Sequence, residues 1–287
     1  MKASKIPELR VPKSQSLYLL IDGNAVDKLA EKIYSLTENL NVQCIYTNSP
    51  LQPLREASPW LIELLDSQRF SVLAWAQEQN FFENQAAWLF ISESNIETTA
   101  DHFRSLVEVE HPMGHQVVFR LQDPRVARAL FTYHAEQNHF ELTGPISESW
   151  FYVQEKWFKV KSFPQPVNKR KYVLTEQDLN ILNIVAMEQF ILGLDKHISL
   201  YFPHWVAQKK SNTRTIIENA KSRGFTSERA IYFYTNVLGF LGENCLDNNE
   251  YQDIQQLVLM PSRLTPEQRI EKAAHLAYQY SQGEIHV

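Results

Sequence analysis

The chain has few of the residues from which disulfide scaffolds, metal clusters and phosphate-binding loops are built. Only two of its 287 residues are cysteines, Cys44 and Cys245. Because they are far apart in sequence and match no Cys/His metal spacing, we expect two reduced thiols and no disulfide. Only three of the eight glycines, Gly23, Gly114 and Gly144, precede residue 162. Neither G-x-x-x-x-G-K-[ST] nor G-x-G-x-x-G occurs, so a phosphate cradle is not expected.

Long apolar runs are also lacking. No run approaches the roughly 20 apolar residues that cross a bilayer. The first residues, MKASKIPELRVPKSQS, lack the apolar core of about 7–15 residues that a secretory signal needs. We therefore expect no membrane span and a cytoplasmic location. The formal net charge is −5 and the few adjacent lysines and arginines, at 169–171 and 209–210, are interpreted as solvated, so nucleic acid is not an expected partner.

Hydrophobic periodicity divides the chain into two lobes. After an N-terminal extension at 1–16, short strand-like runs alternate with amphipathic helical segments over 17–161, which predicts an α/β lobe. A turn at 110–114 joins 106–109 to 116–121 as a hairpin, so we expect a mixed sheet. The other expected strands are 17–21, 43–46, 60–64, 87–91, 150–153 and 157–161, and the expected helices are 26–36, 70–79, 96–106 and 126–133.

The pattern changes after residue 161. Residues 162–173, which begin SFPQPVNKRKY, have the composition of a linker. Residues 174–287 then carry apolar residues at helical spacing, which predicts an all-helical C-terminal lobe. Thr175 and Asp178 approximate a capping box at the start of a long helix that ends before Pro203. Further helices are expected at 204–223, 227–241 and 265–281. The predicted fold class is α/β of the α+β type.

The stretch LYLLIDGNAV ends an expected strand at Asp22 and Gly23. It resembles the first strand of PIN-like metal-dependent nucleases, in which an aspartate at that place helps to hold a divalent cation. Such a site needs several converging carboxylates, yet the lobe has no D-x-D pair. We therefore favour Asp22 as a helix cap or an Asx turn, and keep a metal-dependent hydrolase centred on Asp22 as the alternative. No metal or cofactor is expected, and no catalytic set is recognised.

The stretch FRLQDPRVARALF is the most informative. Asp123 suits a helix N-cap and Pro124 the first helical position. Arg125 opposes the helix dipole, at a cost of about 0.3–1 kcal/mol. We therefore predict that Arg125, and with it Arg120, pairs with carboxylates inside the lobe, Asp22 being one candidate. A structural role for these residues is favoured over partner binding.

The helix expected at 227–241 is apolar nearly all round, so it is either buried or covered by a partner. Core packing is the favoured interpretation. As a hypothesis, a cleft between the lobes accepts a partner segment, with Trp205, Tyr232 and Phe240 as contacts, because aromatic anchors dominate many interfaces.

With these residues in view, the chain resembles the domain of unknown function 4123 family, the adaptors or chaperones of bacterial type VI secretion. The resemblance covers about residues 17–146. It includes LYLLIDG, SPLQPLREASPWLIEL, WLFISES, DHFRSLVEVEHPMGHQVVFRLQDPRVARAL and LTGPI, and FR-x-x-DPRV is its most specific part. The helical lobe resembles the more variable part of these proteins.

The resemblance implies a task without catalysis. Such proteins bind a toxic effector, often near its N-terminal region, and help to load it onto the VgrG spike. The family supplies no catalytic residues, and Arg120, Asp123, Pro124, Arg125, Asp22 and Gly23 are hallmark positions to which we assign a structural role. The alternatives are the Asp22-centred hydrolase and a structural protein without cargo.

Overall fold

The computed structural model describes residues 5–36, 39–167, 170–206, 212–247 and 249–284. The chain divides into two compact units, residues 1–185 and 186–287. The division falls inside a helix and lies later in the chain than the expected linker.

The first unit is built on a six-stranded sheet with the order β2-β3-β1-β4-β7-β8. Every neighbouring pair of these strands is antiparallel, whereas a mixed sheet was expected. A separate two-stranded sheet pairs β5 (Glu108–Glu110) with β6 (Gln116–Val118), which confirms the hairpin at 110–114 but places it outside the larger sheet. The larger sheet consists of β1 (Ser16–Ile21), β2 (Val42–Cys44), β3 (Trp60–Glu63), β4 (Ala87–Ser92), β7 (Ile146–Val153) and β8 (Lys156–Lys161).

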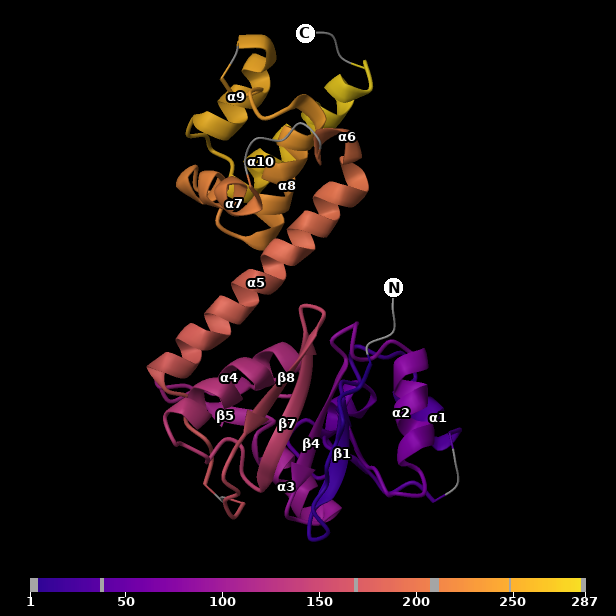
Figure 1. The fold of residues 1–287 in the computed structure, drawn as a ribbon. Coiled ribbons are helices and arrows are strands. Elements are labelled where there is room, and N and C mark those ends of the chain that lie inside the picture. Colours follow the sequence, from indigo (N-terminus) through magenta and orange to yellow (C-terminus); the bar gives the residue numbers. More distant parts are fainter. Residues whose placement is uncertain (1–4, 37–38, 168–169, 207–211, 248, 285–287) are drawn as a thin grey trace. The chain divides into compact units, whose positions relative to one another are not determined.

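The central strands are buried on both faces because their side chains alternate between two apolar clusters. In β1, Leu17 and Leu19 lie in one cluster, whereas Tyr18 and Leu20 lie in the other, as the two-residue period of a strand requires. Helices α1 (Leu29–Tyr34) and α2 (Arg69–Glu78) cover one face, and α3 (Ile96–Ser105) and α4 (Pro124–Glu136) cover the other (Figure 1). A 3₁₀ helix, η1 (Gln52–Ala57), was not predicted.

Several boundaries differ from the sequence predictions for local reasons. The helix expected at 26–36 is shorter, because residues 22–28 form turns that end at Lys28 with φ of 51°. The strand expected at 116–121 ends at Val118, since Phe119 and Leu121 both enter the core before α4 begins. Tyr172, near the end of the expected linker, is tied to the first unit, because its carbonyl accepts the Glu110 N–H.

The second unit is helical in its described residues. Helix α5 (Glu176–Tyr201) begins in the first unit and ends in the second. Helices α8 (Glu228–Leu241) and α10 (Pro266–Ser281) pack against each other, and the capping box at Thr265 is confirmed. The helix expected at 204–223 is replaced by α6 (Pro203–Val206) and α7 (Thr213–Ser222), with 207–211 outside the described residues. The remaining elements, η2 (Asn249–Tyr251) and α9 (Gln252–Leu259), were not predicted.

These observations confirm the α+β class, with a sheet in residues 16–161 and helices dominating residues 176–281. Among the described helices, none is both long enough and apolar enough to cross a membrane.

Gly144 illustrates how tightly the first unit is packed. Its φ is 53°, and a Cβ atom at this position would overlap the imidazole of His102. His102 is buried, which lowers its pKa to about 4, and its neutral ring donates through Nε2 to the Leu142 carbonyl at 3.1 Å. Glycine is therefore required at 144 for both backbone and packing reasons.

We predict that Gly144→Ala lowers the free energy of unfolding by about 1–3 kcal/mol more than Gly114→Ala, because it adds an overlap in the core to the backbone cost. Gly114 is a matched control, since its φ is 85° but no atom lies within 4 Å of the added carbon. Urea denaturation of both variants measures the difference. Equal losses would show that His102 yields without cost.

Candidate functional site

The loop after β1 is fixed by its own hydrogen bonds. Asp22 is 3% exposed, and its Oδ1 accepts the Asn24 N–H at 3.0 Å, which is the Asx turn expected from the sequence. The Asp22 N–H donates to the Ala86 carbonyl at 2.7 Å. A Cβ atom on Gly23 would overlap the Ser58 carbonyl. Glycine thus lets the loop pass close to the backbone before β3.

Arg120 supplies the counter-charge for this buried carboxylate. Its Nη2 donates to Asp22 Oδ2 at 2.6 Å. The side chain of Arg120 is 48% exposed, whereas that of Asp22 is 4% exposed. The pair joins two segments that are 98 residues apart, and it was one of the pairings considered from the sequence.

Arg125 finds a different carboxylate. Asp123 caps α4 by accepting the Arg125 N–H at 2.9 Å, and Pro124 takes the first helical position, as predicted. The guanidinium of Arg125 also contacts both oxygens of Asp123, Nε at 2.9 Å and Nη2 at 2.7 Å. The cation that opposes the helix dipole is therefore neutralised by the cap residue itself. That hallmark residues act structurally stays a prediction.

The surroundings of Asp22 are unsuited to a divalent cation. Asp22 Oδ2 is already paired with the guanidinium of Arg120, whose positive charge would repel a bound cation. Within the described ranges, no group of three or more His, Cys, Asp or Glu side chains is placed to hold a metal ion. Asp22 instead affects Tyr46, whose pKa is raised by burial and by the negative charge of Asp22.

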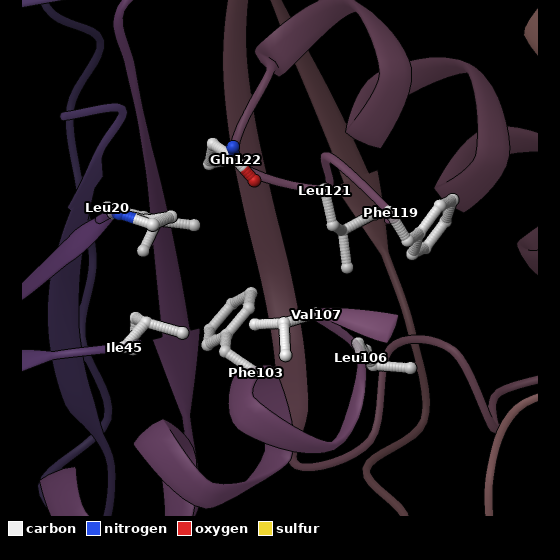
Figure 2. Close-up of a pocket in the computed structure, with 9 residues that line it drawn as sticks. Leu20, Ile45, Phe103, Leu106, Val107, Phe119, Leu121 and Gln122 are labelled. Carbon is white, nitrogen blue, oxygen red and sulfur yellow. The ribbon is translucent and has the colours of Figure 1, made fainter. Parts of the chain in front are cut away.

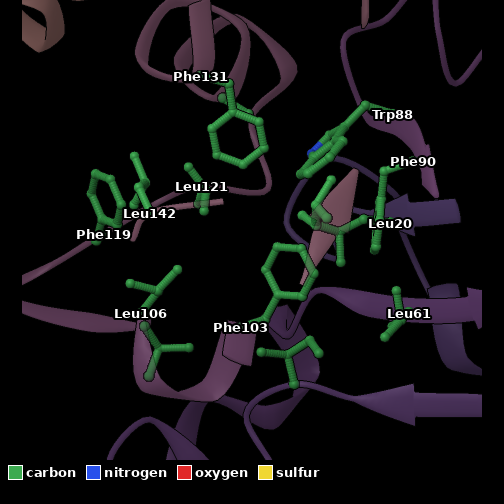
Figure 3. Packing of buried hydrophobic residues seen from close by; sticks show 14 of the residues in the cluster. Leu20, Leu61, Trp88, Phe90, Phe103, Leu106, Phe119, Leu121, Phe131 and Leu142 are labelled. Atoms are coloured by element: carbon green, nitrogen blue, oxygen red, sulfur yellow. The ribbon is translucent and has the colours of Figure 1, made fainter. Parts of the chain in front are cut away.

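A crevice beside this loop is too small for a ligand. Its volume is about 10 Å³, room for about one water molecule. Figure 2 shows that its walls are apolar apart from Gln122, which precedes the α4 cap. Most of the wall residues belong to the aromatic core of the first unit, part of which is shown in Figure 3. The crevice is a packing gap, and small-molecule sites are far larger.

Sequence reasoning missed a second polar cluster in the first unit. The carboxylate of Asp178 is fully buried and accepts from His134 Nε2 at 2.8 Å, from the Tyr172 hydroxyl at 3.0 Å and from the Thr175 N–H at 2.9 Å. The Thr175 hydroxyl in turn accepts the Asp178 N–H, so the expected capping box is present. The cluster ties the C-terminal half of α4 to the first turn of α5. Only the capping pattern was visible in the sequence.

Hydrogen bonding decides the charge of Asp178. Burial opposes ionisation, but the hydrogen bonds from His134 and Thr175 outweigh it, so the pKa of Asp178 is lowered. Burial and the Asp178 charge raise the pKa of Tyr172, which therefore stays a neutral donor. An open depression of about 790 Å³ lies beside the cluster and is lined by His134, His139, Glu141 and Tyr172 among others. Among these residues, the Tyr172 hydroxyl also lies 3.2 Å from His134 Nε2.

The aromatic residues suggested as partner contacts lie in the helical unit. Trp205 is 4% exposed and belongs to the core of that unit. Tyr232 and Phe240 are partly buried and pack against the same core, with Phe240 in edge contact with Phe202. Their role in binding a partner stays a prediction.

We predict that Arg120→Met lowers the free energy of unfolding by about 1–2 kcal/mol, because a buried carboxylate loses its cation while the half-exposed partner limits the effect. Arg10→Met is the control, since Arg10 and Glu8 form an exposed pair. Thermal denaturation at neutral pH compares the two. An Arg120→Met variant as stable as the wild type would remove the structural role of the pair and favour partner binding by Arg120.

The lowered pKa of Asp178 predicts an acid dependence of stability. The unfolded chain binds this proton more readily than the folded one, so stability is complete above the ordinary aspartate pKa of 3.8 and falls as the pH drops through the lower folded value. Asp178→Asn should reduce the slope of melting temperature against pH in this range. Asp101→Asn, at a carboxylate whose side chain is 65% exposed, should keep the slope. An unchanged slope in Asp178→Asn would refute the assignment.

Known proteins share the sequence segments described above. The sequence profile of the family described as Domain of unknown function (DUF4123) matches residues 17–139, which include the Asp22 loop and the α4 cap. The chain is 31% identical over 293 residues to "Accessory protein VasW" of Vibrio cholerae serotype O1, and the similarity covers 99% of this chain and 95% of the relative. No solved structure matches. The resemblance drawn from the sequence is confirmed, and the chain belongs to the DUF4123 family.

Proposed function

We propose that this chain is a type VI secretion accessory protein that binds a cognate toxic effector and helps to load it onto the VgrG spike. The observation that carries the proposal is the similarity to an accessory protein along nearly the whole length of both chains. It includes the helical unit, so the proposed task belongs to the two units together.

The arrangement of the hallmark residues supports a binding protein over an enzyme. Asp22, Arg120, Asp123 and Arg125 are used in pairs with one another. These ion pairs hold the loop after β1 and the start of α4 in place. Both carboxylates are engaged by arginines, so neither is available to hold a metal ion that activates water. We therefore propose a non-enzymatic role in the bacterial cytoplasm, where the effector would be met before secretion.

The proposal predicts that the chain co-elutes with its effector. The full chain is co-expressed with the effector encoded beside its gene, and size-exclusion chromatography is combined with a measurement of the soluble effector. We expect a common peak and a higher soluble yield than for the effector alone. Truncation of the effector's N-terminal region should abolish the common peak while the chain still elutes as a folded protein.

Two outcomes would contradict the proposal in different ways. If the chain elutes alone and the effector is equally soluble without it, this chain does not act on that cargo. Hydrolysis by the purified chain that requires a divalent cation and disappears in Asp22→Asn would support the alternative. Asp123→Asn is the matched control, because it alters a paired carboxylate on the adjacent loop.

A further inference from the structure

Strand β8 forms one edge of the six-stranded sheet and belongs wholly to the first unit. It is joined to β7 by the turn residues Gln154 and Glu155, both with positive φ, which fixes the register of the hairpin. Six consecutive residue pairs join the two strands. The opposite edge strand, β2, has only three residues. Of the two edges of the sheet, the β8 edge is therefore the longer, and it offers more backbone groups to an added strand.

The register shows which backbone groups of β8 point away from β7. Ser162 follows the strand, and its N–H donates to the Ser147 carbonyl at 2.9 Å. Since hydrogen-bonded pairs alternate in antiparallel ladders, Val160 and Phe158 also bond to β7. The N–H and C=O groups of Trp157, Lys159 and Lys161 must then point outward. Among the described residues, these outward groups have no backbone partner.

Lysines mark both faces of this edge. Lys159 and Lys161 project on the face of Trp157, whereas Lys156 projects on the opposite face with Phe158. Lys159 contacts Glu148 at 2.7 Å and is 42% exposed. Lys156 and Lys161 are exposed, and neither has an acidic partner among the described residues. The edge thus carries a positive charge on each side of the sheet.

Arg128 on α4 adds a fourth cation, from a different element. Its guanidinium lies over the ring of Phe158, 4.8 Å from the centroid, and its Nε is buried without a hydrogen-bond partner in the part of the chain that the structure describes. A half-buried guanidinium without a carboxylate is costly to keep. Lysines on an edge strand commonly protect it against aggregation. This protective role explains the lysines of β8, but it does not explain why Arg128 on α4 lacks a carboxylate partner.

We propose that β8 receives an extended acidic segment of the cargo as an additional antiparallel or parallel strand of the sheet. The outward backbone groups would supply the main-chain hydrogen bonds. Acidic side chains on one face of the added strand would meet Lys159 and Lys161, and those on the other face would meet Lys156 and Arg128. The inference deepens the proposed function and rests on it for the identity of the segment.

The test uses the full chain and a short fluorescein-labelled peptide of the repeat Glu-Glu-Thr-Thr, which places glutamates on both faces of an added strand, followed by fluorescence anisotropy. We expect the peptide to bind, and a peptide with lysine in place of glutamate not to bind. The double variant Lys156→Glu with Lys161→Glu should weaken binding by about tenfold or more, because like charges then face each other. Lys13→Glu with Lys272→Glu changes the net charge equally at exposed lysines elsewhere, and it should bind as the wild type does.

Two single substitutions separate charge from backbone pairing. Arg128→Met should weaken binding without lowering the melting temperature, because it removes an unpaired cation and keeps the packing over Phe158. Lys161→Pro removes an outward N–H and leaves the bonds to β7, a change that edge strands accept. It should weaken binding more than Lys161→Gln, which removes the charge alone.

The proposal is overturned if the acidic peptide does not bind, or if the edge double variant binds it as tightly as the control double variant. Equal binding by Lys161→Pro and Lys161→Gln would also overturn it, since the contact would then be purely electrostatic. Failure of the proposed function is recognised separately. In that case the wild-type chain would not co-elute with its cargo, whatever the peptide does. Cargo that co-elutes equally with both double variants would leave the function standing and reject this edge.

Discussion

The packing of Trp88 at the centre of the sheet is the interaction on which the first unit depends. Its ring lies 5.0–6.0 Å from those of Phe90, Phe103, Phe131 and Phe151, which brings β4, α3, α4 and β7 together (Figure 3). Aromatic contacts of this kind add to the large area that each ring buries. The indole Nε1 has no hydrogen-bond partner among the described residues, so the site favours shape over polar pairing.

Because this core fixes α4 against the sheet, it also fixes the charges at both ends of that helix. At the start, Asp123 and Arg125 neutralise each other, and nearby Arg120 reaches across to Asp22. Towards the end, His134 reaches Asp178 at the beginning of α5. Between them, Arg128 lies over the ring of Phe158, and no carboxylate pairs with it among the described residues. Of the two arginines on α4, Arg125 has its partner within the unit, whereas Arg128 faces the edge strand.

The sequence was most informative where local chemistry decides the structure. The cap at Asp123 and the capping box at Thr265 depend on neighbouring residues and were predicted correctly, and the Asx turn at Asp22 is one of the two local roles that were expected there. Partners distant in sequence were harder. Arg125 was expected to pair with a carboxylate inside the lobe, and its partner is the cap residue Asp123 two positions away, whereas the candidate Asp22 pairs with Arg120. The link between His134 and Asp178 spans 44 residues and had no periodic signal. Whether a strand such as β8 lies at the edge of the sheet depends on the order of the strands. The alternation of apolar and polar residues within one strand does not reveal that order.

Cargo that adds a strand to β8 would form hydrogen bonds with the outward amides of that strand. Residue-resolved amide hydrogen exchange on the full chain, free and co-purified with its cargo, detects such bonds. We expect slower exchange at Trp157, Lys159 and Lys161, with little change at Phe158 and Val160, whose amides already bond to β7. Slower exchange confined to residues 186–287, with β8 unchanged, would contradict this expectation.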